Sequence, residues 1–163
     1  MDSGIIVVEA DLARREHQAV VVHLTSAYAA DPMGAGGPLA PAVTERMIPG
    51  LRATPSTRVF LAYLAGEAVG LATCFVGFST FQARPLINIH DLAVLEHTRG
   101  RGVGRALLAA VESAAREMGC CKVTLEVNER NGRALRLYRS AGFAQAGADG
   151  PTGGALFFAK ALT

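Results

Sequence analysis

Short runs of β-branched and aliphatic residues alternate along the chain with longer segments whose apolar positions recur every three or four residues. Runs of the first kind predict strands, because neighbouring side chains of a strand point to opposite faces of a sheet. The segment 86–94 (LINIHDLAV), rich in Ile and Leu, is the strongest of these strand predictions. The full set of predicted strands is 5–8, 58–64, 68–75, 86–94, 122–127, 143–146 and 155–161.

Segments of the second kind predict four helices, because their apolar residues share one face. Asp11 is placed to cap the first helix, which should stop before Pro32 because a residue preceding proline avoids helical backbone. Pro49 is expected to end or kink the second helix. The first helix ends near residue 31, and the others are predicted over 42–51, 103–118 and 131–141.

The order of these elements is β α α β β β α β α β β, which predicts a mixed α/β domain with one helical crossover between strong strands. A length of 163 residues fits one domain, covering residues 1–163. Residues 31–41, which are rich in glycine and proline, and residues 75–85 are the expected substrate loops.

The composition is that of a folded domain. Apolar residues make up 50% of the chain and charged residues 18%, so there is ample apolar surface to offset chain entropy. A formal net charge of +2 is too balanced to indicate a nucleic-acid or polybasic membrane binder. We expect no membrane partner either, because no run approaches the about 18 apolar residues of a membrane span. No secretory leader is recognised at the start of the chain.

Three cysteines are present, and Cys120 and Cys121 are adjacent to each other. An odd number with this spacing predicts neither a disulfide framework nor a zinc site. Reduced thiols favour a cytoplasmic protein without a bound metal. A cysteine nucleophile would need a basic neighbour, and the sequence places none, so we expect buried structural thiols.

Charge is unevenly distributed, and one glycine-rich segment lies within the basic part. Residues 97–140 hold nine Lys and Arg against four Asp and Glu, which predicts a local anion site. Within this part, residues 99–104 (RGRGVG) connect the strongest strand to the strongest helix. Glycines let a ligand approach the backbone, and a helix N-terminus offers unpaired N–H groups with a partial positive charge. The segment therefore predicts a phosphate-binding turn.

Three phosphate-binding patterns compete for this turn. A Walker A loop fails because Gly104 is followed by Arg105 rather than by Lys and Ser or Thr. A dinucleotide fingerprint lacks its third glycine, although Glu126 lies at about the distance that the ribose-binding acid requires. The pattern Arg/Gln-x-x-Gly-x-Gly/Ala is matched in full by residues 99–104.

With this turn the sequence resembles the GNAT superfamily of acyl-CoA-dependent N-acetyltransferases. The resemblance extends to the apolar strand before the turn, which ends in the Leu-x-Val of residues 92–94. A second family motif, Asn-x-x-Ala-x-x-Leu-Tyr-x-x-x-Gly-Phe, appears in residues 131–143 (NGRALRLYRSAGF). Two motifs at the expected separation are far more specific than either alone.

The resemblance implies the acyl-CoA N-acyltransferase fold. Its α/β (α+β) architecture has a mixed, largely antiparallel central sheet of about six or seven strands flanked by about four helices. It also implies transfer of an acetyl group from acetyl-CoA to a primary amine by direct attack in a ternary complex. A non-catalytic acyl-CoA-binding module and, with weaker support, a nicotinamide-nucleotide-binding domain are the alternatives.

For the cofactor site, the resemblance places the diphosphate of coenzyme A on the glycine turn and its pantetheine amides along the strand before it. The N–H of Val94 is then a candidate donor to the thioester oxygen. Asn131 is expected to cap a helix and also to face the cofactor. The implied cofactor-binding residues are Leu92, Ala93, Val94, Arg99, Gly100, Arg101, Gly102, Val103, Gly104, Arg105, Asn131 and Tyr138.

For catalysis, the resemblance makes Tyr138 the candidate general acid for the leaving thiolate. The general base is expected from His90 or Asp91 on the preceding strand, and Glu126 on the next strand is a third candidate. Adjacent strand positions face opposite ways, so only one of His90 and Asp91 is expected to face the cleft.

The acceptor amine is not specified by the sequence. Asp31, Asp91 and Glu126 are the candidate substrate-binding residues, because their carboxylates attract a cationic amine. Small-molecule amines and protein amines both stay open as partners, and a homodimer through the late strands is expected by analogy with the family alone.

Overall fold

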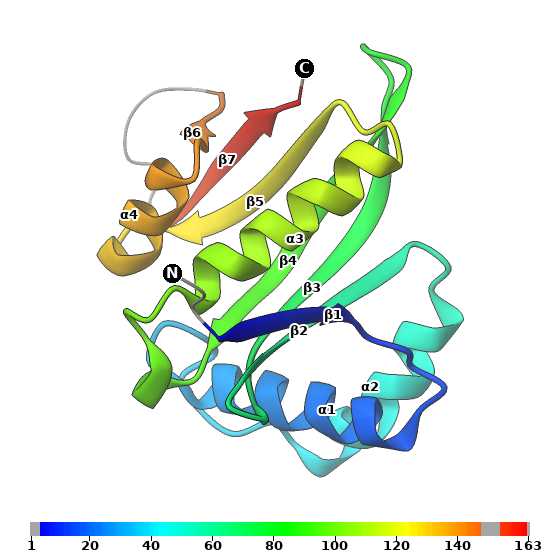
Figure 1. Cartoon of the computed structure of the whole chain (residues 1–163), viewed down its shortest axis with the longest axis vertical. Helices are drawn as coiled ribbons and strands as arrows, with labels where there is room; N and C mark the ends of the chain where they lie inside the picture. The colour runs from blue at the N-terminus through cyan, green and yellow to red at the C-terminus, as the bar shows by residue number, and fades with distance from the viewer. Residues whose placement is uncertain (1–3, 148–153, 163) are drawn as a thin grey trace.

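The computed structural model describes residues 4–147 and 154–162 (Figure 1). Within those residues the chain forms seven strands, four α-helices and one short 3₁₀-helix. The strands are β1 (Ile5–Glu9), β2 (Thr57–Leu64), β3 (Glu67–Ser79), β4 (Arg84–Val94), β5 (Lys122–Asn128), β6 (Ala144–Gln145) and β7 (Ala155–Ala161). The helices are α1 (Arg15–Ala30), α2 (Pro41–Ala53), η1 (Glu96–Thr98), α3 (Val103–Glu117) and α4 (Gly132–Ser140).

The strands form one sheet in the order β1-β2-β3-β4-β5-β7-β6. Among the described residues, β4 and β5 are the one parallel pair, and α3 provides the crossover that a parallel connection requires. All other neighbours are antiparallel. The predicted mixed, largely antiparallel sheet is confirmed. A dinucleotide-binding domain needs an open, mostly parallel sheet, so the nicotinamide-nucleotide alternative is wrong.

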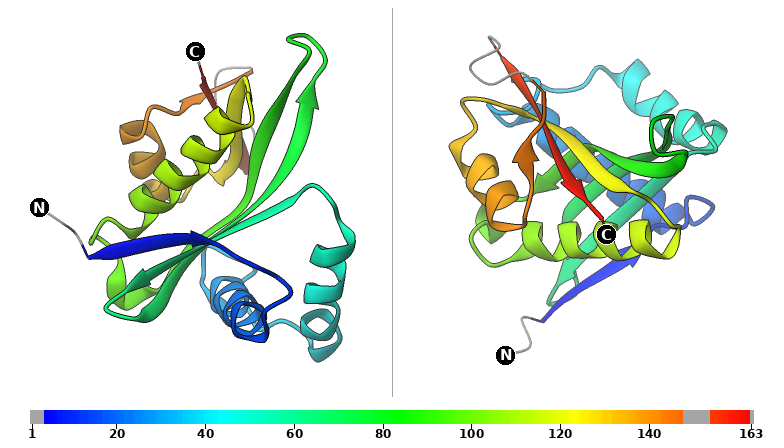
Figure 2. Two further views of the ribbon diagram at one scale, coloured as in Figure 1. Left: turned by 45° about the vertical axis from the view of Figure 1, so that its right-hand side comes forward. Right: turned by 90° about the horizontal axis from the view of Figure 1, so that it is seen from above.

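Helices cover both faces of the sheet, with α3 on one face and α1 and α2 on the other (Figures 1 and 2). Alternating residues of the central strands supply the two cores. In β2, Phe60 packs toward α3, whereas Val59 and Leu61 pack toward α1. On the α3 side, Leu107 and Val111 are fully buried, as the apolar face predicted for this helix requires.

A β-bulge interrupts β4 in its second half. Thr73 of β3 pairs with Asp91 and the next residue, Cys74, pairs with Ile89, so His90 is the extra residue. The bulge changes the alternation of faces. Ile89 and Leu92, three positions apart, both pack against the α3-side core. The bulge therefore places His90 and Asp91 together toward the opposite face, so the two do not alternate as adjacent residues of a regular strand do.

Three local predictions differ from the structure. The segment 75–85 is no loop, because β3 continues to Ser79 and β4 starts at Arg84, and the two form a long hairpin. Pro49 lies inside α2 without ending it, and no residue of α2 is buried. Asp11 does not cap α1, which begins at Arg15; its carboxylate accepts a hydrogen bond from the Ala13 amide at 3.0 Å instead.

The packing of α3 against β3 requires a glycine at position 70. A Cβ atom there would lie 2.7 Å from Cγ1 of Val103 and 3.2 Å from the carbonyl oxygen of Ala93. We expect Gly70→Ala to lower the free energy of unfolding by about 1–3 kcal/mol, because overpacking forces a buried neighbour to move. Urea denaturation measures the change.

Gly50→Ala is the matched control, because Gly50 lies in α2 and a Cβ atom there meets nothing within 4 Å. Alanine should stabilise the helix at this position by about 0.5–1 kcal/mol. Equal effects of the two substitutions would contradict the close approach at Gly70.

Candidate functional site

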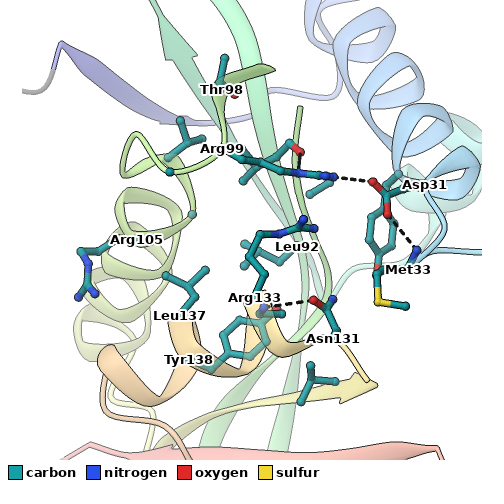
Figure 3. A pocket seen from close by; sticks show the side chains of 18 of the residues that line it. Asp31, Met33, Leu92, Thr98, Arg99, Arg105, Asn131, Arg133, Leu137 and Tyr138 are labelled. Atoms are coloured by element: carbon teal, nitrogen blue, oxygen red, sulfur yellow. Dashed lines mark hydrogen bonds and ion pairs between the residues drawn. The ribbon is translucent and has the colours of Figure 1, made fainter. Parts of the chain in front are cut away.

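A cavity opens where β4 and β5 separate. Their parallel pairing covers three residue pairs and ends at Ile89 and Leu125. Beyond that point, a cavity of about 420 Å³ lies between the strands, bounded by α3, α4 and the end of α1 (Figure 3). Its walls are formed by Tyr28, Asp31, Met33, Leu92, Ala93, Val94, Thr98, Arg99, Gly100, Gly102, Val103, Gly104, Arg105, Glu126, Val127, Asn128, Asn131, Arg133, Ala134, Leu137 and Tyr138.

The glycine turn forms the part of this wall that suits an anion. Gly100 and Gly102 have φ values of 77° and 92°, left-handed conformations that glycine adopts without strain. The first backbone bond of α3 runs from the Ala106 amide to the Gly102 carbonyl at 3.0 Å. The amides before Ala106 in this helix therefore have no intrahelical acceptor. Together with the helix dipole, they offer the donors that a diphosphate needs.

The arginines predicted for the cofactor differ in where they lie. Arg101 does not line the cavity. Arg105 points away from its centre and donates a hydrogen bond to Oγ of Ser140 at 2.5 Å (Figure 3). Arg99 lies inside, but its guanidinium bonds to the Val94 carbonyl oxygen at 3.2 Å and to the Asp31 carboxylate at 2.5 Å. Arg133, which sequence reasoning did not single out, also lines the cavity.

Asp31, a predicted substrate-binding residue, is thus already paired. The Arg99 guanidinium, together with a hydrogen bond from the Met33 amide at 2.9 Å, holds the pKa of this carboxyl below its usual value. Glu126 lines the same cavity from β5 and is exposed, and no ion pair involves it within the described residues. Of these two predicted carboxylates, Glu126 is the one whose charge is not matched by an arginine.

Tyr138 projects from α4 into the floor of the cavity (Figure 3). Its side chain is buried and its ring packs against Phe143 with centroids 6.1 Å apart. Burial, with a smaller contribution from Tyr28, raises the pKa of the Tyr138 phenol well above its usual value. The phenol is therefore protonated at any physiological pH, the state that a hydrogen-bond donor requires.

Asn131 performs the capping role predicted for it. Its side-chain oxygen accepts a hydrogen bond from the Ala134 amide at 3.1 Å, one turn into α4. The residue also lines the cavity. The cap fixes the start of α4 and with it the direction in which Tyr138 projects.

Tyr28, at the end of α1, is a cavity residue that sequence reasoning missed. Burial raises the pKa of its phenol, and the nearby negative charges of Asp91 and Asp31 raise it further. The helical periodicity of α1 marked Tyr28 only as an apolar-face position. Its place just before the glycine- and proline-rich segment 31–41 was the available signal that it stands near a site.

Neither His90 nor Asp91 lines the cavity wall. His90 is exposed and its ring contacts that of Phe75 edge to face, with centroids 5.6 Å apart. Asp91 is half-buried, and burial raises the pKa of its carboxyl, while the positive charge of His90 opposes this shift. Asp91 also acts on the Tyr28 phenol, which does line the cavity. Of the two predicted bases, Asp91 is thus the one linked to the cavity through its charge.

The described residues contain no group of three or more His, Cys, Asp and Glu side chains arranged to hold a metal ion. All three cysteines are buried and lie outside the cavity wall. Burial raises the pKa of the Cys74 thiol to about 12, so this thiol is a poor nucleophile at neutral pH. In the described part of the chain, no helix has the length and apolar character that crossing a membrane demands.

Comparison with known sequences gives a consistent set of relatives. A family model described as acetyltransferase (GNAT) family matches residues 24–143. Streptothricin acetyltransferase of Streptomyces lavendulae is 37% identical over 94 residues, covering 57% of this chain and 48% of that protein. N-alpha-acetyltransferase MAK3 of Arabidopsis thaliana is 38% identical over 87 residues, covering 53% of this chain and 45% of that protein. The chain thus spans about half the length of these curated relatives.

Solved structures agree with the fold. Nourseothricin acetyltransferase superposes with a TM-score of 0.55 at 32% identity, covering 66% of each chain. A chain of the NatC complex bound to Gag peptide and CoA superposes with a TM-score of 0.73, covering 98% of this chain and 99% of that one. At 20% identity, the second match shows a shared fold alone.

Proposed function

Because the chain belongs to the acetyltransferase (GNAT) family, we propose that it transfers an acetyl group from acetyl-CoA to a primary amine. One observation carries the proposal. One cavity is bordered by the first amides of α3, by the end of β4 that has no partner on its β5 side, and by the protonated hydroxyl of Tyr138. The buried position of the cysteines favours direct attack in a ternary complex over an acyl-cysteine route.

The cavity residues suit the successive parts of coenzyme A. The turn amides from Gly100 to Arg105 would hold the diphosphate, since they combine clustered donors with a helix N-terminus. Leu92 to Val94 lie beyond the end of the β4–β5 pairing, so an extended pantetheine arm can pair there as an added strand does. A cavity of about 420 Å³ is within the usual size range of ligand sites.

Each catalytic residue has a defined task in this proposal. Bound acetyl-CoA supplies the thioester. The Val94 N–H donates to the thioester oxygen as negative charge develops there, and the amine nitrogen bonds to the carbonyl carbon as the C–S bond breaks. The Tyr138 hydroxyl donates its proton toward the departing sulfur. Burial raises the pKa of the Tyr138 phenol, so the phenol keeps its proton until negative charge develops on the sulfur.

The proton of the attacking ammonium is assigned to Asp91. The bulge directs Asp91 toward the α1 side of the sheet, and its charge reaches the cavity residue Tyr28. Because Asp91 does not line the cavity wall itself, a water molecule is assigned to relay the proton. His90 keeps the pKa of Asp91 from rising further.

The acceptor is proposed to be a cationic primary amine. Glu126 presents on the cavity wall a carboxylate that no ion pair within the described residues matches. The two relatives differ in the acceptor that their names indicate, because one is a streptothricin acetyltransferase and the other an N-alpha-acetyltransferase. An acceptor screen should therefore contain both small-molecule amines and protein amines.

The test measures CoA binding by calorimetry and thiol release from acetyl-CoA with a panel of polyamines, amino acids, streptothricin-class antibiotics and N-terminal peptides. We expect CoA to bind and one amine class to accelerate thiol release. Gly102→Ala should weaken CoA binding about tenfold or more, because alanine is strained at φ 92° and disturbs the turn amides.

Gly119→Ala is the matched control, because Gly119 has φ 73° and follows α3 at the end remote from the turn. It carries similar backbone strain and should leave CoA binding unchanged. If CoA binds but no amine releases the thiol, the protein is a non-catalytic CoA-binding module. If CoA does not bind, the proposed function is rejected.

The variant Tyr138→Phe tests whether Tyr138 is the general acid that protonates the departing sulfur. We expect kcat to fall by about 10²-fold or more, the usual contribution of a positioned acid, with little change in CoA affinity. Tyr63→Phe, a half-buried tyrosine of β2 outside the cavity, is the control. Unchanged kcat in Tyr138→Phe would remove the phenol from the mechanism.

The pH dependence tests the base. Asp91 works as a base only when ionised, so kcat/KM should rise with pH through its raised pKa. Asp91→Asn should abolish this rise, the acidic limb of the pH profile. His90→Gln removes the charge that lowers the pKa of Asp91, so the limb should move to higher pH. If His90→Gln abolishes the limb and Asp91→Asn does not, His90 is the base.

A further inference from the structure

Arg99, the first residue of the glycine turn, forms an ion pair with a residue outside the turn. Arg99 donates from Nε to the carbonyl oxygen of Val94 at 3.2 Å and from Nη2 to the carboxylate of Asp31 at 2.5 Å (Figure 3). The two side chains of this ion pair are only 22% and 16% exposed, so solvent screens the pair less than a surface ion pair. The contact joins residues 68 positions apart in the sequence, between the β4–α3 turn and the segment after α1.

Asp31 begins the α1–α2 loop, residues 31–40, and organises its first turn. Its carboxylate accepts from the Met33 amide at 2.9 Å, and its carbonyl accepts from the Gly34 amide at 2.9 Å. The loop is also seated on the end of α1, because a Cβ atom at Gly34 would lie 2.0 Å from the carbonyl oxygen of Tyr28. A change in the position of the Asp31 carboxylate therefore also moves the turn of residues 31–34, which is packed against the end of α1.

The ion pair also stands between two cavities. A second cavity, of about 310 Å³, lies beside α1 and shares with the first one the residues Tyr28, Asp31, Ala93, Val94 and Arg99. The remainder of its wall is mostly apolar and comes from α1, from Pro32 of the α1–α2 loop and from the residues that follow β4. Met33 of the loop lines the first cavity only. The Arg99–Asp31 pair thus fixes the α1–α2 loop as one wall of the first cavity.

An arginine with this geometry is poorly placed to serve as a phosphate ligand. Its charge is matched by Asp31, and the fork of the guanidinium is divided between a carboxylate and a main-chain carbonyl. The turn amides remain for a diphosphate. Arg101, in the same turn, is exposed and has no hydrogen bond or ion pair recorded within the described residues.

We propose that Arg99 is a positioning residue, which ties the α1–α2 loop to the glycine turn through Asp31, so that CoA bound at the turn orders the loop. This inference rests on the proposed function, because it takes the turn to be the CoA site. By linkage, a more ordered loop binds CoA more tightly, and the loop that CoA orders is also a wall of the space open to the amine.

The test compares hydrogen–deuterium exchange of the loop amides between 33 and 37, with and without CoA, in the full chain. In the unaltered protein we expect CoA to slow exchange by about threefold or more, as an ordered turn opens less often. Asp31→Asn keeps an oxygen that can accept from Met33 but removes the charge that holds Arg99. In this variant CoA should still bind within about threefold of its original Kd, while its effect on loop exchange is lost.

Arg99→Met should reproduce both results, and the double variant should be no worse than either single one, because each removes the same interaction. Arg52→Met, an exposed arginine of α2, is the control for loss of a positive charge and should keep the CoA-dependent protection. If Arg99→Met does not fold, Asp31→Asn carries the test alone.

Three outcomes overturn the inference. If Arg99→Met weakens CoA binding about tenfold or more while Asp31→Asn leaves it unchanged, Arg99 is a phosphate ligand. If CoA binds and the loop protection persists in Asp31→Asn, the ion pair does not couple the two segments, and the proposed function stands. If the unaltered protein binds no CoA, the proposed function fails and this inference fails with it.

Discussion

The site depends on the separation of two parallel strands. β4 and β5 are paired over only three residue pairs, and past Ile89 the main chain of β4 runs on without β5 beside it. Exposed strand edges normally attract further strands, and here the edge is enclosed instead by α3, α4 and the end of α1. The consequence is a cavity whose wall contains main-chain hydrogen-bonding groups, which suits a ligand that is itself amide-like and extended.

A close approach between α3 and α4 borders the cavity. A Cβ atom at Gly104 would lie 2.8 Å from Cδ2 of Leu137, so the first turn of α3 and the middle of α4 touch through a glycine. The Asn131 cap fixes where α4 begins. Tyr138 therefore enters the cavity from a helix that is held at both its start and its centre. The glycines of the turn thus serve two purposes, since they expose amides to a ligand and admit a neighbouring helix.

Electrostatics divide the cavity into unlike ends. At the turn, helix-terminal amides dominate, and the nearby arginine charge of Arg99 is matched by Asp31. Toward β5, the carboxylate of Glu126 on the cavity wall contributes negative charge. Under the proposed function, an anionic group is favoured at the first end and the ammonium of the acceptor at the second.

The sequence by itself determined most of the elements and located the glycine turn. Apolar periodicity located α3 and its buried face, the strand 86–94 lies within β4, and Asn131 was correctly placed at the start of α4, because each signal is local in the chain. Only the tertiary structure decided the rest. The bulge turned His90 and Asp91 to the same face, since register is a property of two strands rather than one. The pairing of Arg99 with Asp31 and the entry of Tyr28 into the cavity required segments far apart in the chain to meet, and no local pattern records such a meeting.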